Sequence, residues 1–152
     1  MSSVSLHELL SENGLLDRAE KVEDSLYKLT WGSAHVVIGV TDHALVVIAP
    51  MFRSVPPGDE LAFFHRLLQA NSALGGMAAF AIQPDGWVVL QSGRDLAGLD
   101  ADELALIVTT VARAADELDD VLHREFFAKP GSGEKPAEEA SGEKPAEEAS
   151  DA

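Results

Sequence analysis

The sequence predicts an α+β domain built on a five-stranded antiparallel sheet, in the order helix, three strands, helix, two strands, helix. Two observations favour this class. Strand-like apolar runs fall into two groups, and only short turns separate neighbours within a group, as in antiparallel hairpins rather than βαβ units. A long amphipathic pattern near the end of the folded part then predicts a helix that can lie across the sheet.

The first element is a short helix at the N-terminal end. Ser5 followed three residues later by Glu8 forms a capping box, in which each residue can satisfy a free backbone N–H of the first turn. Leucines follow on one face, and Gly14 can end the helix in a left-handed conformation. The residues between Gly14 and Leu26 are polar and are predicted to form a link.

Three strands are predicted next, at residues 26–31, 34–40 and 44–49. All three are rich in β-branched and aromatic residues, and short turns separate them. Pro50 is expected to stop the third strand, because proline cannot donate to a ladder of backbone hydrogen bonds. Residues 51–57 are then expected to form an irregular connection.

The second helix is predicted to open at residues 57–59 and to fade near Asn71. Leu61, Phe64 and Leu68 recur at helical spacing, so they are the expected core-facing stripe of this helix. If they pack inward, the helix covers part of one face of the sheet.

The C-terminal half holds two strands and a long helix. Strands are predicted at residues 77–83 and 87–92, because a Pro-Asp-Gly turn joins two apolar runs. Leu99 as hydrophobic staple, Asp100 as cap and Glu103 at the third position then begin a helix of about 25 residues. Its apolar positions are Leu104, Val108, Val111, Ala115, Leu118 and Leu122.

Most of the predicted strands are nearly unbroken runs of apolar residues. In an antiparallel sheet with one solvent-exposed face, apolar and polar residues should alternate along each strand. Both faces are therefore expected to be covered. The long helix can cover one of them. The two shorter helices can leave part of the other open, so a second subunit or a client chain would complete the cover unless packing within the chain suffices.

Composition and charge limit the classes of function. The chain has 152 residues, no cysteine and a formal net charge of -15. Without cysteine, a disulfide framework, a thiolate zinc site and a cysteine nucleophile are excluded. The negative charge argues against nucleic acid and anionic membranes as partners. No signal-peptide pattern or membrane-length apolar run is present, so the cytoplasm is the expected compartment.

The domain is predicted to occupy residues 1–128 and a disordered acidic tail residues 129–152. Within the tail, the nine residues SGEKPAEEA occur twice in succession, and residues 132–152 hold seven acids and two lysines. Such a segment lacks the apolar side chains needed to offset the entropy of ordering it. The tail is either a solubilising extension or an electrostatic docking arm.

Four short segments resemble the YbjN domain family, bacterial proteins loosely described as sensory regulators. They are Val46 to Pro50, Leu67 to Asn71, Arg94 to Asp100 and Ala115 to Asp120. The resemblance covers about residues 20–126. It implies a fold similar to the class I chaperones of type III secretion, which are small acidic dimers that hold an extended client around their surface.

Five residues are the candidate partner-binding residues. Trp31, Phe52 and Trp87 are aromatic, and such residues dominate binding energy when they are exposed at an interface. Arg53 and Arg94 are rare cations in an acidic body, and either could pair with a carboxylate of a partner. The alternatives are a core position for each aromatic residue and an ion pair within the domain for each arginine.

No pattern indicates catalysis or a cofactor. The five histidines are scattered without metal-ligand spacing, no serine has a nucleophile motif, and no glycine-rich loop opens a helix. The acids near Asp116 on the last helix are read as a solvated face or as an attraction for a basic client. The leading hypothesis is a non-enzymatic adaptor or chaperone-like module that binds a protein or peptide as a homodimer, through strand edges or through an apolar face left open by the short helices. The alternative is a sensory regulator with a small-ligand pocket between the second helix and the sheet.

Overall fold

The computed structural model describes residues 5–128, so the predicted tail lies outside the described residues. The chain divides at Asp119 into two units, and the sheet belongs to the first. The described residues of the second unit form the last part of α3. There the N–H groups of Phe127 and Ala128 donate hydrogen bonds to the His123 carbonyl. The elements are α1 (Leu6–Glu12), a 3-10 turn (Leu16–Arg18), β1 (Ala19–Glu23), β2 (Leu26–Trp31), β3 (Ala34–Val40), β4 (Ala44–Phe52), α2 (Glu60–Ala73), β5 (Ala79–Ile82), β6 (Val88–Asp95) and α3 (Ala101–Phe126).

The sheet is antiparallel and has six strands in the order β1-β2-β3-β4-β6-β5. The α+β class and the predicted helix and strand groups are confirmed, but the count of five strands was wrong. The missed strand is β1, which pairs Ala19 with Leu29 and Glu20 with Lys28. Four of its five residues are exposed. An edge strand with neither face in the core needs no apolar alternation, so it has the composition of a link.

Pro50 does not end β4, the strand that the sequence predicted to stop at residue 49. Pro50 lies within β4 opposite Val89, and the register shifts between Pro50 and Phe52 before the strand ends. This irregularity accommodates a residue that has no N–H to donate. Met51 and Phe52 therefore belong to the sheet rather than to an irregular connection.

Both predicted helix caps are confirmed. The Ser5 hydroxyl accepts a hydrogen bond from the Glu8 N–H at 3.3 Å. The Asp100 carboxylate accepts from the Glu103 N–H at 2.8 Å. Because each cap satisfies a free backbone donor of the first turn, the starts of α1 and α3 follow from local sequence alone.

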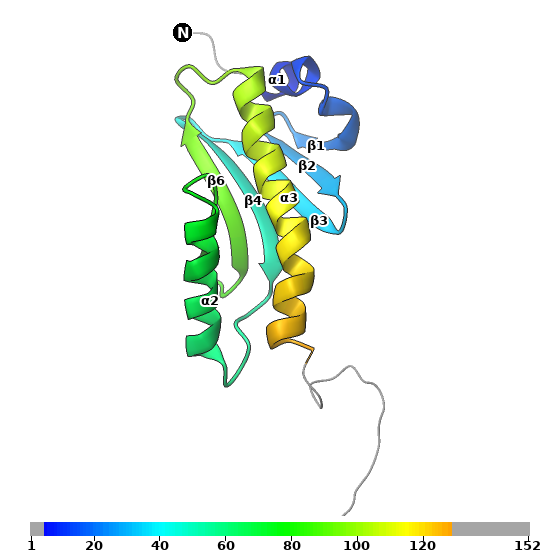
Figure 1. Cartoon of the computed structure of the whole chain (residues 1–152). Coiled ribbons are helices and arrows are strands. Elements are labelled where there is room, and N and C mark those ends of the chain that lie inside the picture. The colour runs from blue at the N-terminus through cyan, green and yellow to red at the C-terminus, as the bar shows by residue number, and fades with distance from the viewer. Residues whose placement is uncertain (1–4, 129–152) are drawn as a thin grey trace, which may run out of the picture. The chain divides into compact units, whose positions relative to one another are not determined.

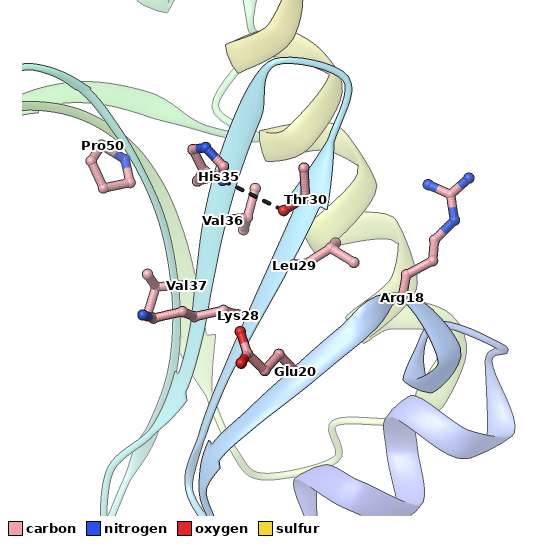
Figure 2. A pocket seen from close by; sticks show the side chains of 9 residues that line it. All are labelled: Arg18, Glu20, Lys28, Leu29, Thr30, His35, Val36, Val37 and Pro50. Carbon is pink, nitrogen blue, oxygen red and sulfur yellow. Dashed lines mark hydrogen bonds between the residues drawn. The ribbon is translucent and has the colours of Figure 1, made fainter.

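The core lies between one face of the sheet and the helices, with α3 crossing that face (Figure 1). Ile38, Val47 and Val108 are completely buried there. We call this the covered face. Alternate residues of β2, β3 and β4 point the other way, and over these strands no helix of residues 5–119 lies on that side, as Figure 2 shows near β2 and β3. We call it the open face. The expectation that both faces are covered is thus wrong over these strands.

The core-facing stripe predicted for α2 was also wrong. Leu61 and Leu68 are 84% and 68% exposed, and Phe64 is exposed as well. The buried residues are Phe63, Leu67 and Ala70. The helix carries apolar residues on two neighbouring stripes, and helical spacing cannot tell which of them will face the sheet.

Candidate protein-binding interface

Four of the five predicted contact residues lie at one end of the sheet. Trp31 ends β2, Phe52 ends β4, Arg53 follows it, and Trp87 directly precedes β6. Antiparallel pairing places these strand ends side by side, since Phe52 pairs with Val88 in the register. The structure thus brings together residues that the sequence singled out one at a time.

Two arginines cover the two tryptophans at this end. The Arg53 guanidinium carbon lies 5.4 Å from the centroid of the Trp87 ring. Arg18, which sequence reasoning missed, lies 4.9 Å from that of Trp31. Both arginines are exposed and both tryptophans are half-buried. Such cation–π contacts hold the side chains in place, and the exposed arginines form the outer surface of each pair. We call this set of four residues the Arg–Trp end.

Phe52 and Arg94 have roles within the domain. The Phe52 ring makes an edge-to-face contact with Phe63 of α2, with ring centroids 6.2 Å apart. Arg94 lies at the opposite end of the sheet, opposite Leu45. It forms an ion pair with Glu103 and donates to the Asp95 carbonyl at 2.7 Å. Arg94 therefore fastens the β6–α3 connection to the start of α3.

Two hollows adjoin the Arg–Trp end. One, of about 350 Å³, lies between β3, β4, Trp87 and the Ala115–Asp119 stretch of α3. The other, of about 470 Å³, lies on the open face (Figure 2). Its lining is Arg18, Glu20, Lys28, Leu29, Thr30, His35, Val36, Val37 and Pro50. The two hollows share His35 and Pro50, so they form one continuous stretch of uneven surface.

Asp116 ties α3 to this end of the sheet. Its carboxylate accepts hydrogen bonds from the Ser33 N–H at 2.7 Å and the Ser33 hydroxyl at 2.9 Å. These bonds, the backbone one first, hold the pKa of the Asp116 carboxyl below its usual value. The acid that the sequence suggested as part of a solvated face is thus a structural contact.

Both edges of the sheet are protected against strand addition. The β1 edge carries charged side chains, including an ion pair between Lys21 and Asp24 at 2.7 Å. At the other edge, the Asn71 side chain accepts from the Phe80 N–H at 2.6 Å and so occupies a backbone group of β5. Charges and occupied backbone groups both disfavour pairing with another strand. A partner is therefore better accommodated on a face than at an edge.

The exposed stripe of α2 is a second apolar surface. It consists of Leu61, Phe64 and Leu68, which lie at successive helical turns. A cluster of exposed large apolar side chains on one helix is unusual on a monomer and is typical of a contact surface. The sequence contains this stripe, but the pattern by itself indicated a buried position.

Among residues 5–128, no group of three His, Asp or Glu side chains is arranged to hold a metal ion. Within the same residues, no helix combines the length and apolar character needed to span a bilayer. Neither of the two hollows beside the Arg–Trp end has a lining residue from α2, so neither is the small-ligand pocket predicted between that helix and the sheet.

Comparisons with known proteins agree with this fold. The model of the YbjN family, described as "Putative bacterial sensory transduction regulator", matches residues 2–124. A comparison with curated proteins finds no match.

The solved structures that are similar to the chain include three proteins with the following values. A chain of the ExoU–SpcU complex from the type III secretion system of Pseudomonas aeruginosa has a TM-score of 0.60 and 20% identity, and the match covers 78% of this chain and 98% of that one. The Yersinia pestis type III secretion chaperone SycH, in complex with a fragment of YscM2, has a TM-score of 0.52 and 22% identity, with 74% and 95% covered. E. coli YbjN has a TM-score of 0.51 and 16% identity, with 76% and 90% covered. At these identities the likeness establishes a shared fold.

Proposed function

The chain belongs to the YbjN family, and from this membership we propose that it is a non-enzymatic, chaperone-like adaptor that binds a segment of a protein partner on the open face and the Arg–Trp end. The similar secretion structures, which are complexes with protein partners by their own descriptions, support this proposal. The observation that carries it belongs to this chain, however. It is the sheet face left without a helix, with two Arg–Trp pairs at its end whose arginines are exposed.

The open face has the composition of a binding surface. Val37, Val46 and Ile48 are half-buried in its centre, and the exposed polar residues Lys28 and His35 lie beside them. An apolar centre with a polar rim is the usual anatomy of a protein interface. Trp and Arg are also the residue types that most often dominate binding energy. Trp31, Arg53 and Trp87 therefore remain our proposed contact residues, with Arg18 added to them.

The proposal includes a homodimer that forms through the exposed stripe of α2. Leu61, Phe64 and Leu68 carry no charge, so two copies of a strongly acidic chain can meet there without facing like charges. A two-fold interface requires a self-complementary patch, and an apolar helix stripe satisfies that requirement. The open face then stays available for the partner.

A second candidate function is a sensory regulator that binds a small ligand. Two observations favour it: the description of the family, and the volumes of the hollows, about 350 and 470 Å³, which fall within the usual range for ligand sites. A metabolite panel that raises the unfolding temperature, in the absence of any protein partner, would support this function instead.

The test of the adaptor function is binding that depends on the Arg–Trp end. Partners are captured from the native cell extract at low salt, and the dominant one is purified and titrated by calorimetry against the protein and its Trp87→Ala variant. Loss of a central anchor worth about 2 kcal/mol should weaken binding roughly 30-fold. Lys21→Gln, which changes an exposed cation on β1, should leave the affinity unchanged. Equal affinity for all three proteins would refute the proposed site.

A further inference from the structure

We propose that the partner segment crosses the open face in extended form, along a row of residues that includes two glycines, and that an acidic side chain of the segment pairs with Lys28. The inference rests on the proposed function, because it names the kind of segment that the adaptor binds. It is carried by a register row, two glycines, a hollow and the distribution of charge.

The register places four residues in one row across the open face. Gly39 pairs with Leu26 on one side and with Val46 on the other. Val46 in turn pairs with Gly93, so the row crosses β2, β3, β4 and β6. We call it the glycine row. Its ends are three strand spacings apart, or roughly 14 Å. An extended segment of about four or five residues covers that distance.

The fold itself does not require a glycine at position 39. Gly39 is not among the glycines with a positive φ, and the pairing of β3 is regular on both sides of it. The nearest atom that a Cβ would meet is the end of the flexible Leu26 side chain, at 3.4 Å. A glycine inside a strand lowers stability and often marks a place where another backbone approaches closely. We assign that role to Gly39.

Gly93 has a different local cause and the same effect on the surface. A Cβ there would lie 2.8 Å from the Leu45 carbonyl oxygen, so the chain's own backbone excludes a side chain. Val46 thus has a position without a side chain on each side of it. The next positions on the same face are two residues away along each strand, or roughly 7 Å. An α-helix is wider, with a diameter of about 10 Å. An extended backbone therefore fits the glycine row better than a helix does.

A further hollow adjoins the β6 end of the glycine row. Its volume is about 330 Å³, and Val46 and Gly93 line it together with Gly76 and Ala78 from the α2–β5 connection. None of the residues that line it carries a charge. This end of the row therefore suits apolar side chains of the bound segment.

The β2 end of the row has a charge opposite to that of the chain. The chain has 26 acidic residues, but β2, β3 and β4 contain none. The exposed edge strand β1 does carry acids, at Glu20 and Glu23, so strand geometry alone does not exclude them. Lys28 lies next to Leu26 on the open face, and Figure 2 shows its side chain extended toward Val37, its partner in the register. A carboxylate is the complementary group at this end.

These features together describe one kind of occupant. It is an extended, mainly apolar segment whose acidic residue lies at the β2 end, while its apolar side chains contact Val37 and Ile48 and enter the hollow at the other end. The net charge of -15 would by itself favour a basic segment. A preference for an acidic one is therefore specific to this site.

Selection of random displayed peptides on the full chain at physiological salt tests the inference. The tightest peptide is then synthesised with a fluorophore and titrated by anisotropy. It should be apolar and contain at least one Asp or Glu. Replacing its acids by the corresponding amides should weaken binding about two- to fivefold, as expected for loss of an exposed ion pair.

Substitutions at Gly39 test the close approach of a backbone. Gly39→Ala should weaken peptide binding about threefold and Gly39→Val roughly tenfold, because each side chain fills the row. Neither should lower the unfolding temperature, since the space beside Gly39 is free and a side chain favours the strand. A purely structural role for Gly39 gives the reverse, with a lower unfolding temperature and an unchanged affinity.

Charge substitutions test the acidic end of the segment. Lys28→Gln should weaken binding of the acidic peptide about two- to fivefold. Glu20→Gln removes the acid opposite Lys28 and should strengthen binding by a similar factor. Lys21→Gln is the matched control, because Lys21 lies opposite Tyr27 on the other side of β1, and it should leave the affinity unchanged.

The inference is overturned if the selected peptides are basic, or if they bind the Gly39→Val variant as tightly as the natural chain. Peptides that depend on Trp87 but not on Gly39 would keep the adaptor function and refute only the inference. Peptides that depend on Gly39 but not on Trp87 would keep the inference and refute the Arg–Trp end. If no peptide is selected, both fail. If Gly39→Val instead abolishes self-association in sedimentation equilibrium, the occupant of the row is a second copy and the inference fails.

Discussion

The two faces of the sheet differ although the same strands supply both. Along β3 and β4, Ile38 and Val47 are completely buried on the covered face, whereas Val37 and Ile48 are half-buried on the open one. All four are β-branched apolar residues, so composition does not distinguish the faces. These strands therefore carry more apolar surface than the fold of one chain buries. The apolar surface that is left lies on the open face, where a partner can contact it.

The largest expected effect comes from truncating the same residue type on each face. Ile38→Ala leaves a cavity in the fully buried core and should cost about 2–5 kcal/mol of unfolding free energy. Ile48→Ala should cost only about 1 kcal/mol, because part of its side chain is already in contact with water. Urea unfolding of both variants measures the difference. Equal costs would mean that the open face is covered in solution, for instance by a second copy.

The two stripes of α2 repeat this comparison on a helix. Leu67 is 5% exposed and Leu68 is 68% exposed. Leu67→Ala should cost about 2–4 kcal/mol of unfolding free energy. Leu68→Ala should change it by less than about 0.5 kcal/mol, but it should weaken the proposed dimer roughly tenfold, because both copies lose the contact. Urea unfolding and sedimentation equilibrium measure the two quantities. A dimer unaffected by Leu68→Ala would rule out this interface.

The smallest expected effect on unfolding free energy concerns the hydrogen bonds between Asp116 of α3 and Ser33. The Ser33 hydrogen bonds lower the pKa of the Asp116 carboxyl below 3.8 in the folded protein. The charged form therefore contributes stability above about pH 4, and this contribution is lost as the pH falls through the lowered folded pKa. Asp116→Asn keeps an acceptor oxygen but removes the charge. The natural protein should accordingly be the more stable one at pH 7, by an amount that shrinks on acidification.

Urea unfolding of the two proteins at about pH 7 and about pH 2 tests this linkage. Glu117→Gln, which removes the same charge one residue away, is the matched control. A difference between the natural protein and Asp116→Asn that is equally large at both pH values would contradict the role given to the ionised carboxylate.

Local signals predicted most of the fold. The caps at Ser5 and Asp100 and the turn before Trp87 were readable because each involves residues close in sequence. β1 was missed because it lies at the edge and buries little. Pro50 was misread because only the register of β4 against β6 shows that the strand continues past it.

The candidate site was predictable only in part. Trp31, Arg53 and Trp87 were singled out by residue type, but their proximity depends on strand order. Arg18 gave no signal, since nothing in its local sequence shows that it will lie over a tryptophan thirteen residues away. For Arg94, the ion pair with Glu103 provides the contact within the domain that had been the alternative to binding a partner.

The sequence by itself determined the class of the fold, the starts of α1 and α3, the turns between the central strands and the acidic character of the chain, since these depend on short-range geometry and composition. The tertiary structure alone decided which stripe of α2 is buried, that one face of the central strands stays open, and that two Arg–Trp pairs share an end. The physical reason is that burial is a property of packed elements. An apolar residue has the same preference for leaving water wherever it stands, and only the arrangement of its neighbours decides whether that preference is satisfied.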